Sequence, residues 1–115
     1  MSERQTVSER LARAEASLRS ARAFFYQTAD EFWNIALSGR SPNEREEAIA
    51  GLSVRHAVDA SVRVVDTVYH AAGTSAIFTS NPLERHLRDI HVARQHRFAS
   101  PEEMHVIGAS LLERD

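Results

Sequence analysis

The stretch "VSERLARAEASLRSARAFFYQTADEFWNI", residues 7–35, decides the fold. Its apolar and small residues recur in alternating steps of four and three, at Val7, Leu11, Ala14, Leu18, Ala21, Phe25, Thr28, Phe32 and Ile35. That spacing places them in one stripe along an α-helix. Because no Pro or Gly interrupts the pattern before Gly39, we predict a helix over residues 3–38, roughly 50 Å long at 1.5 Å per residue. So long a helix in a short chain is typical of a bundle, often one built across subunits.

A second helix is predicted from Asn43, its N-cap, to Ala72, with Gly73 as its stop. Apolar residues cover most of its circumference, which is typical of a helix inside a bundle or at an oligomer interface. One narrow polar line remains, at His56, Asp59, Arg63, Asp66 and His70. This line can be solvated or can pair with another chain, and we favour solvation or pairing within the line, since its opposite charges are neighbours.

Two shorter helices complete the chain. The third is predicted over residues 82–97, starting at Pro82, and the fourth begins with Ser100 as its cap and Pro101 at its first position and ends near Leu112. No strand pattern or repeat is present. The predicted fold is therefore all-α, a four-helix up-and-down bundle formed by residues 1–115 as a single domain.

Composition excludes several classes of function. The formal net charge is -2, so bulk electrostatics indicate no nucleic-acid partner. The absence of cysteine removes disulfides, thiol catalysis and thiolate metal sites. No apolar run reaches the roughly 18 residues of a membrane span, and the N-terminus lacks the apolar core of a signal peptide. We expect a cytoplasmic protein without a membrane partner.

The segment "RDIHVARQHR", residues 88–97, holds the candidate chemistry. His86, His91 and His96 are spaced by five residues. Two metal ligands on one helix lie on the same face when they are three or four residues apart, so no metal site is predicted. Two ion pairs of spacing four, Glu84 with Arg88 and Arg85 with Asp89, give the charges a structural explanation. The alternative is a basic surface that faces an anion such as a phosphate.

One resemblance goes beyond these patterns. The segment "YHAAGTSAIFTSNPLERHLRDIHVARQH", residues 69–96, resembles the C-terminal helical domain of the acyl-CoA dehydrogenase superfamily, and more closely its branch of flavin-dependent monooxygenases. "LARAEASLRSARAFFYQTADEFW", residues 11–33, is similar to the opening helix of that domain, and "PLERHLRD" matches the family's Pro-Val/Leu-Glu/Gln-Arg-x-x-Arg-Asp pattern.

The resemblance implies a flavin cofactor, FAD or FMN, and a homo-oligomer, a dimer or tetramer joined through the bundle. Residues 70–76 fall where the dehydrogenases carry Gln-x-x-Gly-Gly-x-Gly, a turn near the adenosine diphosphate part of a neighbouring subunit's flavin; only Gly73 is kept here. The cofactor-contacting residues implied by the resemblance are His70, Gly73, Thr74, Ser75, Arg88 and His91.

His96 is the implied catalytic residue. In many dehydrogenases a Tyr-Glu pair supplies the base that removes the substrate's α-proton, and that pair falls on His96 and Arg97. Arginine stays protonated and cannot be that base. A histidine near this place resembles the monooxygenases, in which it handles protons beside the flavin, a role that titration near neutral pH suits.

Family members run to several hundred residues, so we expect this chain to be part of a longer flavoenzyme or a truncated form, inactive as 115 isolated residues. The leading hypothesis is a monooxygenase-like oxidoreductase. The alternatives are an acyl-CoA dehydrogenase proper and a non-catalytic helical oligomerisation module.

Overall fold

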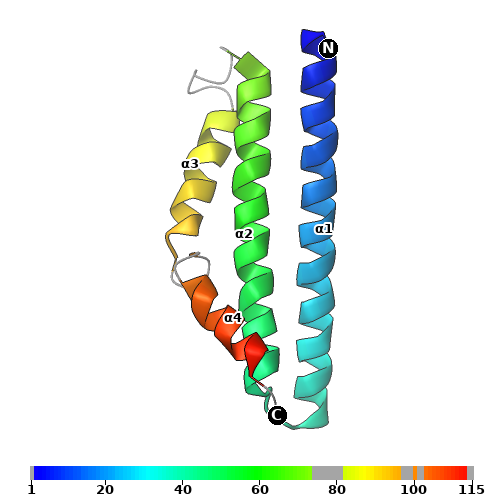
Figure 1. The fold of residues 1–115 in the computed structure, drawn as a ribbon, viewed down its shortest axis with the longest axis vertical. Coiled ribbons are helices and arrows are strands. Elements are labelled where there is room, and N and C mark those ends of the chain that lie inside the picture. Colours follow the sequence, from blue (N-terminus) through cyan, green and yellow to red (C-terminus); the bar gives the residue numbers. More distant parts are fainter. Residues whose placement is uncertain (1, 74–81, 97–99, 101–102, 114–115) are drawn as a thin grey trace.

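The structure is a computed structural model that describes residues 2–73, 82–96, 100 and 103–113. Thr74 and Ser75, two of the expected cofactor contacts, lie outside the described residues. All four predicted helices are present in the described part (Figure 1).

Helix α1, Glu3–Ser38, has the predicted bounds. Its first turn is closed by a reciprocal pair: the Gln5 N–H donates to Ser2 Oγ at 3.2 Å, and the Ser2 N–H donates to Gln5 Oε1 at 2.9 Å. It ends at Gly39, whose φ of 78° lies in the left-handed region that glycine adopts without a steric penalty. Local capping chemistry therefore sets both ends of the helix.

Helix α2, Glu44–Ala72, also has the predicted bounds, with Asn43 as its N-cap and Gly73 after its last turn. The Asn43 side chain accepts the Glu46 N–H at 2.8 Å, and Glu46 in turn accepts the Asn43 N–H at 3.0 Å. The Arg40 guanidinium adds two hydrogen bonds to the same carboxylate, at 2.8 and 2.9 Å. These bonds, from Arg40 first and then from the Asn43 backbone, lower the pKa of Glu46 to about 2.

The last two helices differ from their predicted bounds. Helix α3, Pro82–Arg94, ends before residue 97, and helix α4, Met104–Leu112, begins later than residue 101. Its N-cap is Glu103, which makes no side-chain capping bond. The prediction that Ser100 caps this helix was wrong.

A tightened turn explains where α3 ends. The Gln95 N–H donates to the Val92 carbonyl and the His96 N–H to the Ala93 carbonyl, both at 3.0 Å and both spanning three residues rather than four. The Ser100 N–H then donates to the His96 carbonyl at 2.9 Å, so Ser100 closes this turn instead of starting a helix.

Helix α2 lies between the other helices (Figure 1). Helix α1 runs antiparallel along one side of it, while α3 and α4 follow one another along the other side. Helix α2 packs against all three, whereas α1 hardly touches α3 or α4. The all-α class with four helices is confirmed for the described residues. Because α3 and α4 follow one another along the same side of α2, the four helices form three rows, and the molecule measures 52 × 31 × 28 Å.

The core is narrow. Its buried side chains are Ala21, Thr28, Ile35, Ser53, Arg55, Ala60, Val62 and Ile107. The apolar stripe predicted for α1 divides lengthwise: Ala21, Thr28 and Ile35 are buried, whereas Leu11, Leu18 and Phe25 are exposed. The exposed large apolar residues of α1 are Leu11, Leu18, Phe25, Tyr26, Trp33 and Leu37. Helix α1 therefore presents a second apolar face that no described residue of this chain covers.

Candidate functional site

The C-terminal end of α2 carries two of the predicted site residues. His70 is exposed in the last turn of α2, with its ring edge-on to Tyr69 at 6.1 Å between centroids. Its carbonyl accepts the N–H of Gly73. Gly73 has a φ of 66°, and a Cβ built there would meet no atom of the described residues within 4 Å. No described side chain therefore fills the space beside this glycine.

A cavity of about 430 Å³ lies between this end of α2 and the start of α1. It is lined by Glu3, Thr6, Val7, Arg10, His70, Ala71 and Gly73. Arg10 and His70 bring donors that suit a phosphate, and Thr6 brings a hydroxyl whose proton is donated to the Ser2 carbonyl at 3.1 Å. The donor set fits an anionic group better than a metal ion.

The predicted ion pairs of α3 are present but long. Arg88 Nε lies 3.9 Å from Glu84 Oε1, and Arg85 Nε lies 3.8 Å from Asp89 Oδ2, with both arginines largely exposed. Such surface pairs contribute little to stability. The Oε2 atom of Glu84 is buried and has no hydrogen-bond partner among the described residues.

His91 is exposed, and its ring contacts α2. Its Nε2 lies 3.2 Å from Asp66 Oδ1, and one turn further along α3 the Arg94 guanidinium lies 3.8 Å from Asp59 Oδ1. Asp59 also pairs with Arg63 on its own helix, at 3.2 Å. The polar line of α2 is therefore self-paired in part, as predicted, but both of its aspartates also hold α3 in place.

His96 lies in the turn after α3 and is exposed. Helix α3 has 13 residues and an axial length of about 20 Å, so His96 is about that far from the start of α3. The C-terminal end of α2, which carries His70 and is followed by Gly73, lies toward the same end of the molecule as the start of α3 (Figure 1). The predicted residues consequently do not form one site in this chain: one group sits at the α2 end and His96 sits at the other end of α3.

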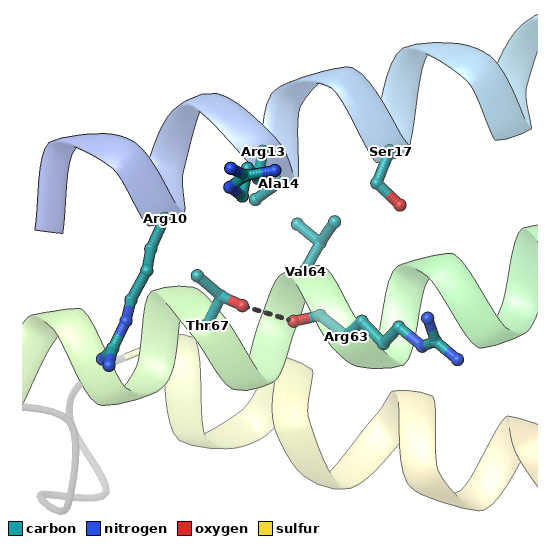
Figure 2. Close-up of a pocket in the computed structure, with 7 residues that line it drawn as sticks. All are labelled: Arg10, Arg13, Ala14, Ser17, Arg63, Val64 and Thr67. Atoms are coloured by element: carbon teal, nitrogen blue, oxygen red, sulfur yellow. Dashed lines mark hydrogen bonds between the residues drawn. The ribbon is translucent and has the colours of Figure 1, made fainter. Parts of the chain in front are cut away.

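A groove between α1 and α2 is a feature that the sequence patterns did not reveal (Figure 2). Its volume is about 280 Å³, and it is lined by Arg10, Arg13, Ala14, Ser17, Arg63, Val64 and Thr67. Arg63 belongs to the polar line already described, but only the folded hairpin places it along the same groove as Arg10 and Arg13. The spacing of Arg10, Arg13 and Ser17 on one side of α1 was the available signal.

Arg55 is a buried charge in the middle of α2, only 6% exposed. Its Nε donates to the Ser100 carbonyl at 2.9 Å, and one terminal nitrogen donates to the Gly51 carbonyl at 3.1 Å. The other terminal nitrogen lies 3.4 Å from Glu103. Arg55 therefore joins α2 to the turn that precedes α4 and positions that turn without facing any cavity described above.

No group of three or more His, Cys, Asp or Glu side chains within the described ranges could hold a metal ion. In the same part of the chain, no helix has both the length and the hydropathy needed to cross a bilayer.

A family model described as "Acyl-CoA dehydrogenase, C-terminal domain" matches residues 1–101. The match covers α1, α2 and α3 in full. The chain therefore belongs to the family of acyl-CoA dehydrogenase C-terminal domains.

Three curated relatives of the chain are named as monooxygenases or as a monooxygenase subunit. An indole-3-acetate monooxygenase of Acinetobacter baumannii is 33% identical over 95 residues, 83% of this chain and 24% of that protein. An indole-3-acetate monooxygenase of Pseudomonas putida is 33% identical over 98 residues, 85% of this chain and 25% of that protein. HsaA of Mycobacterium tuberculosis, the oxygenase subunit of a flavin-dependent monooxygenase, is 29% identical over 99 residues, 85% of this chain and 25% of that protein. This chain spans about a quarter of the length of these relatives. No solved structure gives a significant match.

Proposed function

We propose that this chain acts as the C-terminal helical domain of a flavin-dependent oxidoreductase of the monooxygenase kind, in which it contributes to the flavin pocket and to the core of a homo-oligomer. The observation that carries the proposal is the family match over residues 1–101 together with relatives named as monooxygenases. Reduced flavin would supply the electrons with which such an enzyme activates O₂.

The residues of the α2 end fit one part of such a cofactor. Arg10 and His70 offer donors to a phosphate group, and no described side chain fills the space beside Gly73. Nothing among the described residues encloses an aromatic ring system at His96, which is exposed. The proposal therefore requires the rest of a longer protein, or a second subunit, to complete the pocket.

His96 is proposed as the proton-handling residue. Its ring would hold a proton on one nitrogen while the other accepts or donates a hydrogen bond, which is the behaviour that suits imidazole near neutral pH. Arg88 and His91 would contribute at the flavin-facing surface or through the structure of α3, since Glu84 and Asp66 already occupy them in part.

The test uses a full-length enzyme that carries this domain. A His96→Ala variant should lose at least about 100-fold in the rate of oxygenated product formation, the size expected for loss of a general acid or base. It should also form less product per O₂ consumed. His86→Ala, an exposed histidine on the same helix, is the matched control and should behave as the wild type. Full product yield in the His96→Ala enzyme would contradict the assignment.

The dehydrogenase alternative is distinguished by substrate. Under anaerobic conditions an acyl-CoA should bleach the bound flavin of a dehydrogenase, and we expect no bleaching here because the position of the family's glutamate base is occupied by Arg97. The non-catalytic module is distinguished by flavin affinity. Tight flavin binding to the 115-residue chain would exclude that alternative.

The second apolar face of α1 supports the oligomer. Trp33 is 66% exposed and Leu37 70% exposed, and Arg22 stacks over Tyr26 at 5.3 Å from the ring centroid beside them. A helix face with several exposed large apolar side chains is typical of a protein interface. Light scattering after gel filtration should return a multiple of the 12.9 kDa monomer mass.

A further inference from the structure

His96 lies just beyond the end of α3, where the helix gives its backbone little support. Helix α3 ends at Arg94, and the His96 N–H donates to the Ala93 carbonyl at 3.0 Å, a bond that spans three residues rather than four. Tightened turns of this kind have poorer hydrogen-bond geometry than an α-helix, and helix ends fray. The position of His96 therefore depends on what holds its carbonyl, on the side away from α3.

Two hydrogen bonds connect the His96 carbonyl to the core of α2. The Ser100 N–H donates to that carbonyl at 2.9 Å, and the Ser100 carbonyl accepts a hydrogen bond from Arg55 Nε, also at 2.9 Å. Arg55 belongs to α2 and is only 6% exposed. The contacts thus run from a buried side chain, through the backbone of Ser100, to the backbone of His96.

The Arg55 guanidinium is itself held in place. One of its terminal nitrogens donates to the Gly51 carbonyl at 3.1 Å, one turn earlier on the same helix. Gly51 also leaves room for this nitrogen, because a Cβ added there would lie 3.0 Å from it and 3.6 Å from the side chain of Ile107. A planar, buried guanidinium that is bonded on two sides has little freedom, so it can fix the position of the groups that it bonds.

A second link between this end of α3 and α2 is weaker. Arg94 lies two residues before His96, and its guanidinium is 3.8 Å from Asp59 Oδ1, with both side chains 36% exposed. A partly exposed pair at this distance contributes little. The bond from Arg55 to Ser100 is therefore the stronger of these two constraints on His96.

We propose that Arg55 is a positioning residue for His96: through Ser100 it sets where the His96 imidazole lies relative to the flavin. This inference rests on the proposed function, in which His96 handles the proton. A general acid or base must lie within hydrogen-bond reach of its proton, and a displacement of about 1 Å can lower the rate about 100-fold. Arg55 lines neither the groove between α1 and α2 nor the cavity at the α2 end, so it acts through His96.

Amide hydrogen exchange tests the contact in the 115-residue chain without flavin. Arg55→Met removes every donor of the side chain, whereas Arg55→Lys keeps the positive charge but places a methylene where Nε donates to Ser100. In both variants the Ser100 amide should exchange at least about tenfold faster, because its bond to His96 loses its anchor. Arg45→Met, at an exposed arginine on the same helix, is the control and should change this rate less than about twofold. Unchanged exchange at Ser100 in either folded Arg55 variant would overturn the inference.

A double-mutant cycle in a full-length enzyme that carries this domain tests the consequence for catalysis. Arg55→Met and Arg55→Lys should each slow the formation of oxygenated product at least about tenfold. In a His96→Ala background the same changes should slow it less than about twofold further, because a residue that acts through His96 has nothing left to position. A merely structural role would slow product formation by the same factor in both backgrounds.

The outcomes separate this inference from the proposed function. A large loss in His96→Ala combined with an equal effect of Arg55→Lys in both backgrounds would overturn the positioning role alone. So would a wild-type rate in Arg55→Lys when its Ser100 amide exchanges fast, because the contact would then be broken without consequence. Full product yield in the His96→Ala enzyme would instead overturn the proposed role of His96, and the positioning role with it.

Discussion

Replacing Arg55 with methionine should release α4 while leaving the α1–α2 hairpin intact. Arg55 is the largest polar side chain in the core, and its bonds run to Ser100, which precedes α4 by a few residues. Methionine keeps the length and most of the apolar stem of arginine but has no donors. The change therefore isolates the hydrogen bonds from the packing.

The magnitude follows from the contact that joins α2 to the segment before α4. The bond from Arg55 to the Ser100 carbonyl, at 2.9 Å, involves a charged donor and is worth about 1.5–3 kcal/mol, whereas the bond to the Gly51 carbonyl, at 3.1 Å, lies within α2. The contact to Glu103 is 3.4 Å long and its carboxylate is 55% exposed, so we assign it almost nothing. Against this gross loss stands the desolvation of a buried cation, which methionine does not suffer. We expect a net loss of about 2 kcal/mol.

Amide hydrogen exchange of α4 is the assay. A loss of about 2 kcal/mol in local stability corresponds to roughly 30-fold faster exchange over residues 103–113, since about 1.4 kcal/mol is a factor of ten. Exchange within the central turns of α1 should change less than about threefold, because α4 hardly contacts α1. Arg45→Met, on the same helix but exposed, is the control.

Exchange of α4 that stays within about threefold of the wild type would refute the reasoning, since it would mean that packing of Ile107 alone holds α4. Amide hydrogen exchange that becomes faster by the same factor in α1 and α4 would also refute the reasoning, because it would show that these helices open as one unit.

Three other predictions follow from single contacts. The folded-state pKa of Glu46 is about 2 against an ordinary 4.5, so the contribution of its ionised carboxylate to stability is complete above pH 4.5 and is lost as the pH falls toward 2. Arg40→Gln should raise the midpoint of the Glu46 carboxyl ¹³C titration, because Arg40 is the largest cause of the lowered pKa. A midpoint that does not move would contradict that cause. His91→Ala removes the contact to Asp66, which is exposed on both sides, so it should cost about 0.5 kcal/mol, seen as faster exchange in α3 with little change in Tm. Trp33→Gln should lower the mass measured by light scattering at a given concentration, whereas an unchanged mass would place the oligomer contact elsewhere.

The sequence predicted the long helices well because their ends are set locally. Ser2, Gly39 and Asn43 act through residues three or four positions away, which a linear pattern can show. The start of α4 was missed because the Ser100 carbonyl, in the segment before that helix, accepts a hydrogen bond from Arg55, 45 residues away. Such a contact exists only once the chain has folded.

The candidate site was predictable only in part for the same reason. Periodicity identified the polar line of α2, but not that Asp66 would meet His91 across 25 residues. The helical stripe of α1 could not show which of its two edges would be buried, because the width of the stripe exceeds the contact that one neighbouring helix makes. The role of His96 rests on the family resemblance, since its position in an exposed turn gives it no distinctive environment.

The central position of α2 has a consequence for the order in which the molecule assembles. Helices α1 and α2 are joined by only five residues, 39–43, so the hairpin forms with a small loss of loop entropy. Helices α3 and α4 find their substantial contacts on α2 alone. During synthesis the hairpin leaves the ribosome before α3 and α4 do. Folding of the remainder then reduces to the docking of two short helices onto a surface that already exists, and we expect fast kinetics dominated by local contacts.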